Sequence, residues 1–145
     1  MPRSIQFIYQ LKGVRVQNST LICRWLTQLA QVNKKHISSI TYILCSDKYI
    51  KGINQQFLNH DYPTDIITFN LSADKTNLIA EIYIGYETIR LNATKYKVTV
   101  KDELHRVLAH GLLHLIGYDD KTEKEIAMMR KAEDEWLSKR TWMKI

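Results

Sequence analysis

The chain has 145 residues and a formal net charge of +6, and 45% of its residues are hydrophobic while 25% are charged. This composition is typical of one globular domain covering residues 1–145, and five Gly, two Pro and two Cys exclude collagen-like and disulfide-framework classes. No apolar run approaches the roughly 18–20 residues of a membrane helix, and Met1–Gln10 lacks the apolar core of a secretory signal. We therefore expect a cytoplasmic protein without membrane contact, whose Cys23 and Cys45 are buried, reduced thiols.

The positive charge is concentrated in the first part of the chain. Residues 1–60 hold eight Lys and Arg and one acid, a charge of +7, whereas residues 61–145 hold thirteen Lys and Arg and fourteen acids, a charge of −1. Such a block attracts polyanions, and nucleic acid is the commonest polyanion in the cytoplasm. The block predicts salt-dependent RNA binding, although a merely solvated basic surface would give the same count.

The first half of the chain predicts alternating strands and helices. Hydrophobic periodicity indicates strands at 4–9 and 37–45, a helix at 19–33 capped by Asn18 or Ser19, and a helix at 47–58 capped by Ser46 or Asp47. The stretch His60-Asp61-Tyr62-Pro63 predicts a loop, because residues before proline avoid the helical conformation.

The second half predicts two more strands and then mainly helices. We expect strands at 65–71 and 79–85, a short helix at 87–96, a helix from Thr99 to Gly117, and a helix opened by a Thr122–Glu125 capping box and running to about Arg140. Strands and helices are mixed without strict alternation. The fold class is therefore α+β, a single domain in which a mixed sheet of about four strands packs against helices, one of them a zincin-like metal helix.

The most informative segment runs from His105 to Asp120. His110 and His114 are four residues apart, so both imidazoles lie on one helix face. Gly117 ends the helix and lets the chain turn back, which brings Asp120 over the pair. A His₂Asp set leaves one tetrahedral position for water, as a catalytic zinc site requires. We predict one zinc ion on His110, His114 and Asp120, although Fe(II), Mn(II) or Ni(II) also suits these donors.

Two neighbouring residues receive other interpretations. His105 lies on a different face of the helix from His110, so we expect it to pack in the interior or to support the ligands from outside. In the simplest alternative, Asp119 and Asp120 only begin a polar loop and favour the N-terminus of the next helix.

The segment is also similar to the metzincin protease pattern HExxHxxGxxH. Gly111 stands where that pattern has its glutamate general base, which weakens the protease interpretation. A phosphodiester substrate fits better, because a metal neutralises a phosphate oxygen and supplies bound water as the nucleophile. No catalytic side chain is assigned. A zinc metalloprotease and a non-catalytic ribosome-assembly factor with a structural metal remain alternatives.

The stretch His110–Asp119 resembles the HGxLHLxGYDH motif of the YbeY family of bacterial metal-dependent endoribonucleases. The segment from Ile53 to Phe69 resembles that family's LNxxYR…D.PTDVLSF stretch, and Leu78–Ile84 occupies the place of its LGDI segment. The resemblance implies a single-strand-specific endoribonuclease in rRNA processing, which matures the 3′ end of small-subunit rRNA and acts in ribosome quality control. It also implies one zinc ion, a cytoplasmic location, and contact with the ribosome or small-subunit proteins.

The chain departs from the family pattern at three places. Asp120 replaces the family's third histidine. Leu58 replaces an arginine that the resemblance implies engages the substrate phosphate, and Lys48 and Lys51 are candidates to take its role. The Gly-Asp of the LGDI segment becomes Ala-Glu here, and we expect Glu81 to be an exposed strand residue rather than a second acid in the cleft.

Overall fold

The computed structural model describes residues 4–58 and 64–143, with side chains given except at positions 57 and 58. The predicted loop at residues 60–63 and the Leu58 side chain therefore lie outside the described part of the chain. The elements are β1 (Ile5–Tyr9), α1 (Ser19–Val32), β2 (His36–Cys45), α2 (Asp47–Leu58), β3 (Ile66–Asn70), β4 (Asn77–Gly85), α3 (Tyr86–Tyr96), α4 (Val100–Ile116), α5 (Glu123–Ser138) and a short 3₁₀ turn (Thr141–Met143). Every predicted helix and strand is present, with its ends within two residues of the expected positions.

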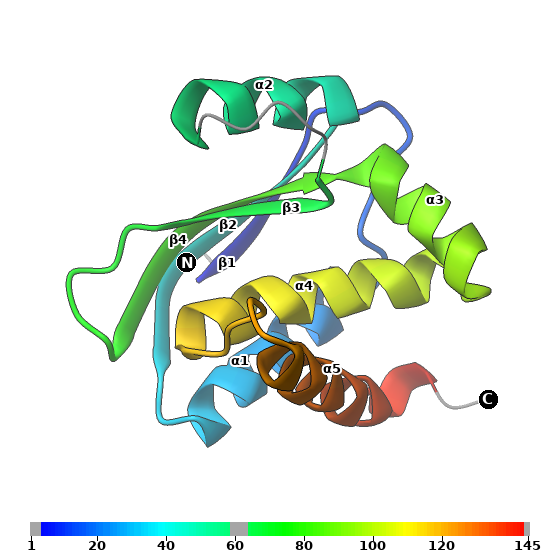
Figure 1. Cartoon of the computed structure of the whole chain (residues 1–145). Helices are drawn as coiled ribbons and strands as arrows, with labels where there is room; N and C mark the ends of the chain where they lie inside the picture. Colours follow the sequence, from blue (N-terminus) through cyan, green and yellow to red (C-terminus); the bar gives the residue numbers. More distant parts are fainter. Residues whose placement is uncertain (1–3, 59–63, 144–145) are drawn as a thin grey trace.

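The described strands form one mixed sheet in the order β1-β2-β4-β3. β2 runs parallel to both β1 and β4, whereas β3 runs antiparallel to β4. The sheet and its flanking helices confirm the predicted single α+β domain (Figure 1).

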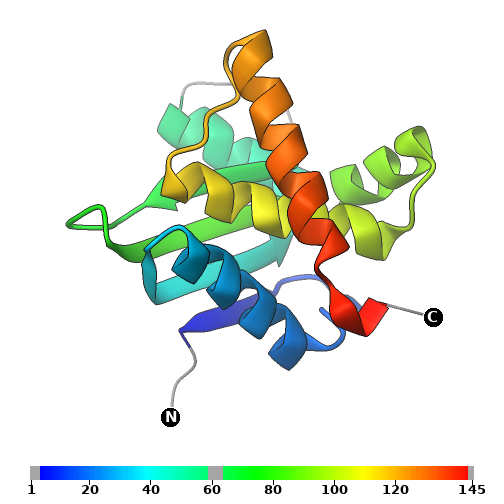
Figure 2. The same cartoon turned by 90° about the horizontal axis from the view of Figure 1, so that it is seen from below.

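Helices cover the two faces of the sheet unequally. α1 and α4 lie on one face with α5 packed outside α4, whereas α2 lies on the other face (Figures 1 and 2). The side chains of β2 point alternately to the two faces of the sheet, so β2 takes part in the packing on both faces. Tyr42 and Leu44 belong to the large core under α1 and α4, while Ile43 and Cys45 belong to a smaller cluster under α2.

One buried hydrogen bond and one close approach fix α4 on the sheet. The Tyr42 hydroxyl donates to the Leu108 carbonyl at 3.0 Å. Gly111 faces the sheet, and a Cβ atom there would lie 2.9 Å from Ile66 Cδ1 and 3.2 Å from Ile82 Cδ1. The glycine therefore lets α4 approach β3 and β4 more closely than any side chain would.

The helix ends follow the predicted capping, with one exception. The Thr99 hydroxyl accepts the Asp102 N–H, the Thr122–Glu125 capping box is complete, and Gly117 ends α4 with φ +129°. Asn18 occupies the N-cap position of α1, but its side chain makes no capping bond, because it adopts the left-handed conformation with φ 57°.

Two further expectations can be checked on the described residues. Both cysteines are free thiols, but only Cys45 is buried; Cys23 is half-buried, which corrects the prediction for that residue. Along the described residues, no helix combines the length and the apolar character needed to cross a bilayer.

His105 packs in the interior, as predicted. It is 2% exposed and lies near the Trp25 and Trp142 rings, with centroid distances of 6.0 and 6.4 Å. Its Nδ1 lies 2.8 Å from Nη1 of Arg140, so neutral His105 accepts a hydrogen bond from the guanidinium. Burial, assisted by the charge of Arg140, lowers the pKa of His105 to about 4.

Substitutions at Gly111 test the close approach of α4 to the sheet. We expect Gly111→Ala to change the free energy of unfolding by no more than about 1 kcal/mol, because the overlap with two flexible isoleucine ends is offset by the higher helix propensity of alanine. Gly111→Glu should lose at least about 3 kcal/mol, because it places an unpaired carboxylate in the core. Urea unfolding measures the free energy of unfolding of both variants. If Gly111→Glu were as stable as Gly111→Ala, the close packing of position 111 against the sheet would be contradicted.

The lowered pKa of His105 predicts that the folded protein loses stability on acidification. Between about pH 6.5 and 4 the unfolded chain protonates His105 and the folded chain does not, so the free energy of unfolding falls as pH falls. The loss is up to about 3 kcal/mol over this window. Urea unfolding of His105→Phe should show a shallower pH dependence than the wild type, whereas the exposed-site control His36→Asn should not. An unchanged slope in His105→Phe would contradict the assignment.

Candidate metal centre

The last two turns of α4 carry the two predicted histidine ligands. The His110 side chain is 24% exposed, and His114 is exposed. After Gly117 the chain returns past these turns, so Nε2 of His110 lies 3.4 Å from an Oδ2 oxygen of Asp120. The structure thus brings Asp120 to the helix face where the sequence places it.

A tighter donor group forms around His114. One donor atom from each of His114, Asp119 and Asp120 lies within 4.8 Å of the others, close enough to hold a metal ion. His110 is not part of this tighter group and meets it at the Asp120 carboxylate. Mixed imidazole and carboxylate donors fit zinc and other divalent transition metals. Asp119, which the sequence analysis assigned only to the loop, is therefore a further possible donor.

A buried acid from α5 supports His110 from behind. Glu133 is 4% exposed, and its Oε2 accepts a hydrogen bond from Nδ1 of His110 at 2.7 Å. Its Oε1 accepts a bond from Nη1 of Arg106 at 2.9 Å, and Nη2 of Arg106 donates to Asp134 at 2.6 Å. A carboxylate on Nδ1 keeps a proton there and leaves Nε2 as the ring nitrogen that faces Asp120.

The sequence analysis did not identify Glu133, although its position carries a signal. Met129, Ala132 and Trp136 form the buried stripe of α5, and Glu133 lies on the same stripe. An acid on the apolar face of an amphipathic helix requires a buried partner. The partners, His110 and Arg106, come from another helix, and the sequence alone does not pair them.

Negative charge dominates around the His110 imidazole. Burial by itself lowers the pKa of His110, but the Glu133 hydrogen bond and the charges of Glu133, Asp120 and Asp65 outweigh it, and the pKa is raised. Burial, with a contribution from Glu133, also raises the pKa of Asp65. This concentration of carboxylates around imidazoles is suited to a bound cation.

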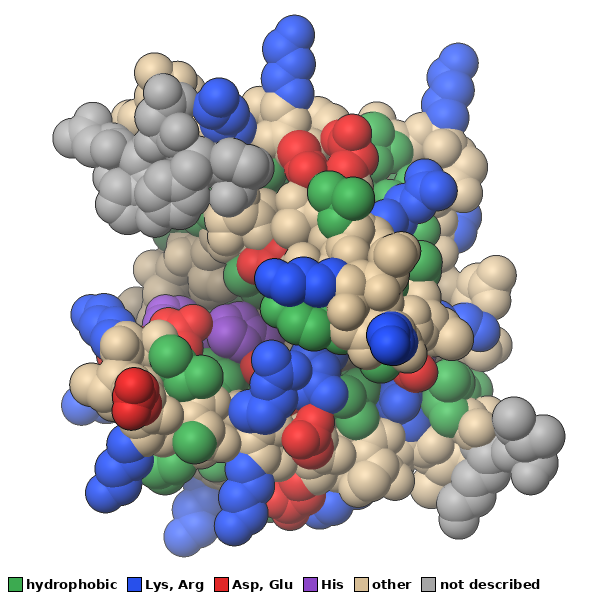
Figure 3. Space-filling view, turned by 45° about the vertical axis from the view of Figure 1, so that its right-hand side comes forward, with side chains coloured by type: hydrophobic (Ala, Val, Ile, Leu, Met, Phe, Trp, Pro, Cys, Tyr) green, Lys and Arg blue, Asp and Glu red, His purple; other side chains and the backbone are tan. Residues whose placement is uncertain are grey.

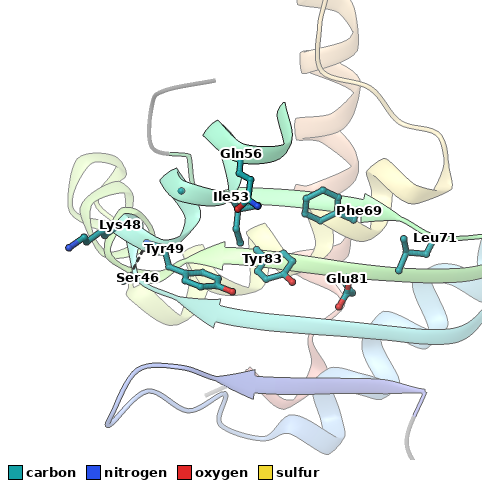
Figure 4. A pocket seen from close by; sticks show the side chains of 10 residues that line it. Ser46, Lys48, Tyr49, Ile53, Gln56, Phe69, Leu71, Glu81 and Tyr83 are labelled. Carbon is teal, nitrogen blue, oxygen red and sulfur yellow. Dashed lines mark hydrogen bonds between the residues drawn. The ribbon is translucent and has the colours of Figure 1, made fainter. Parts of the chain in front are cut away.

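Two residues considered from the sequence lie elsewhere. Lys48 and Glu81 line a cavity of about 860 Å³ together with Tyr49, Phe69 and Tyr83 (Figure 4). This cavity lies between α2 and the sheet, on the face opposite α4. Lys48 therefore lies in this cavity, on the same helix that ends at position 58, and stays a candidate for the role of the family's arginine. Glu81 is an exposed strand residue, as predicted.

Three described lysines of the basic block, Lys35, Lys48 and Lys51, lie at different places on the molecule. Lys35 lines a hollow that also includes Gly117 and Asp119, next to the metal centre. Lys48 lies across the sheet in the cavity under α2, and Lys51 is exposed on α2. These three lysines therefore do not form a single positive patch.

Comparison with known proteins identifies the family of this chain. The family model described as Endoribonuclease YbeY matches residues 9–141. A protein named endoribonuclease YbeY from Cytophaga hutchinsonii is 53% identical over 116 residues, which is 80% of this chain and 81% of that protein. A protein of the same name from Karelsulcia muelleri is 40% identical over 133 residues, which is 92% of this chain and 93% of that protein. The solution structure of a Thermotoga maritima protein superimposes with a TM-score of 0.65 at 30% sequence identity. The match covers 94% of this chain and 88% of that protein. This chain belongs to the YbeY endoribonuclease family.

Proposed function

We propose that this protein is a zinc-dependent endoribonuclease that cleaves single-stranded RNA in rRNA processing and ribosome quality control. The observation that supports the metal dependence is that Asp120 lies beside both His110 and His114 at the end of α4. Family membership supports the RNA substrate. The proposed target is the 3′ end of small-subunit rRNA. The proposed compartment is therefore the cytoplasm, and the proposed partners are the ribosome or its small-subunit proteins.

His110, His114 and Asp120 are the proposed ligands of one zinc ion, with Asp119 beside them. A bound zinc ion would neutralise charge on a phosphate oxygen and make water acidic enough to act as a nucleophile near neutral pH. Glu133 keeps the Nδ1 proton of His110 in place and so presents Nε2 to the site. Arg106 pairs with Glu133 and balances its buried charge.

The structure favours a phosphodiester over a peptide substrate. In the protease pattern, a glutamate general base follows the first histidine of the helix. The residue at that place, Gly111, faces Ile66 and Ile82 in the core, so its position gives no side chain access to the cleft. A protease would need its base from another element.

Activity assays separate the three candidate functions. We expect the purified, zinc-loaded protein to cleave single-stranded RNA, to lose this activity in chelator, to regain it with added zinc, and to leave casein intact. Casein cleavage would favour the metalloprotease. RNA and metal binding without turnover would favour the assembly factor with a structural metal.

Metal content tests the role of Asp120. Asp120→Ala should lower the zinc content of the purified protein well below one ion per chain, because two imidazoles hold an ion poorly. Asp120→His should retain the metal, and Glu135→Ala, an exposed acid outside the donor group and outside the Arg106–Glu133 network, serves as the control. If Asp120 only favours the N-terminus of α5, its loss would cost about 0.3–1 kcal/mol of stability and leave zinc content unchanged.

A further inference from the structure

A cleft of about 250 Å³ opens between α3, α4 and α5, and His110 and Asp120 line it. Figure 3 shows histidine side chains in a hollow of the surface with Lys and Arg side chains at its edges. Asp65, Glu103 and Glu133 also line the cleft, so four carboxylates in all face this space. An anionic substrate that approaches the metal ligands through this cleft therefore needs a cation to hold it.

Two arginines line the cleft, and one of them is already engaged. Both terminal nitrogens of Arg106 are hydrogen-bonded, Nη1 to Glu133 and Nη2 to Asp134. Arg130 on α5 is exposed and forms no ion pair with any carboxylate of residues 4–56 and 64–143. Arg130 is thus the cleft cation that is open to a ligand.

An aromatic ring from α3 positions this arginine. Tyr96 is the last residue of α3, lines the same cleft and is 49% exposed. The Arg130 guanidinium carbon lies 6.0 Å from the Tyr96 ring centroid, and Lys95 Nζ lies 5.5 Å from it. Cation–π contacts of this kind restrain a guanidinium while leaving its N–H donors open. The ring therefore holds positive charge at the mouth of the cleft.

We propose that Arg130, positioned by Tyr96, binds a phosphate of the single-stranded RNA substrate at the mouth of this cleft. A guanidinium suits the task because its fork of donors matches two phosphate oxygens. The assignment rests on the proposed endoribonuclease function. It gives the polyanion a contact next to the metal ligands, where carboxylates otherwise dominate.

A structural role for Arg130 is the competing explanation. Burial raises the pKa of Glu103, and the charges of Arg106 and Arg130 oppose that rise. If Arg130 served only as a counter-charge for Glu103, replacing it would change stability and leave RNA affinity unchanged. The two roles therefore differ in a binding measurement.

The test measures the affinity of the full-length chain for a short single-stranded RNA across a salt series, with chelator present to prevent cleavage. Arg130→Gln should weaken binding about tenfold and reduce the log–log salt slope by about 0.7, the value for one phosphate contact on a single strand. Tyr96→Ala should weaken binding in the same direction, and Tyr96→Phe should restore it. Lys131→Ala, the adjacent exposed cation outside the cleft, is the matched control and should retain the wild-type slope.

Turnover by the zinc-loaded protein separates this inference from the proposed function. Arg130→Gln should raise KM for RNA with kcat nearly unchanged. If the wild type cleaves RNA and Arg130→Gln keeps both the wild-type affinity and the wild-type salt slope, the phosphate contact is overturned and the endoribonuclease function stands. If the wild type neither binds nor cleaves RNA, the proposed function itself fails.

Discussion

The hydrogen bond from His110 to Glu133 is the constraint on which the site depends. It joins the helix that carries the histidines to α5, which closes the cleft, and it sets which imidazole nitrogen faces Asp120. A buried carboxylate is tolerated there because Arg106 pairs with its second oxygen. The final helix is therefore part of the site and not merely a cover for the core.

Packing on the opposite side of α4 imposes the complementary constraint. Gly111 and the Tyr42 hydroxyl bond place α4 against the sheet with one face wholly buried, so His110 and His114 are directed away from the core. The same close approach removes the position from which a protease-type glutamate would act. Gly111 thus both allows the close packing of α4 on the sheet and leaves the site without a protease-type general base at that position.

The elements and the His110–Asp120 meeting were predictable because they rest on local rules: helical spacing, the Gly117 stop and the capping box. Glu133 and Arg130 were not, since their neighbours, His110 on α4 and Tyr96 on α3, are brought to them only by the packing of the folded chain. The surroundings of Lys48 were likewise not predictable. It lines the cavity between α2 and the sheet, and the sequence alone does not show on which face of the sheet a helix packs.

Nitrogen NMR of the histidine rings during zinc titration tests the central claim most directly. If Glu133 presents His110 to the metal, Nε2 of His110 and a ring nitrogen of His114 should both shift on zinc addition, while Nδ1 of His110 keeps its proton. Nε2 of the buried His105 should not respond. A His110 ring that is unchanged by zinc, or that binds zinc through Nδ1, would contradict the arrangement.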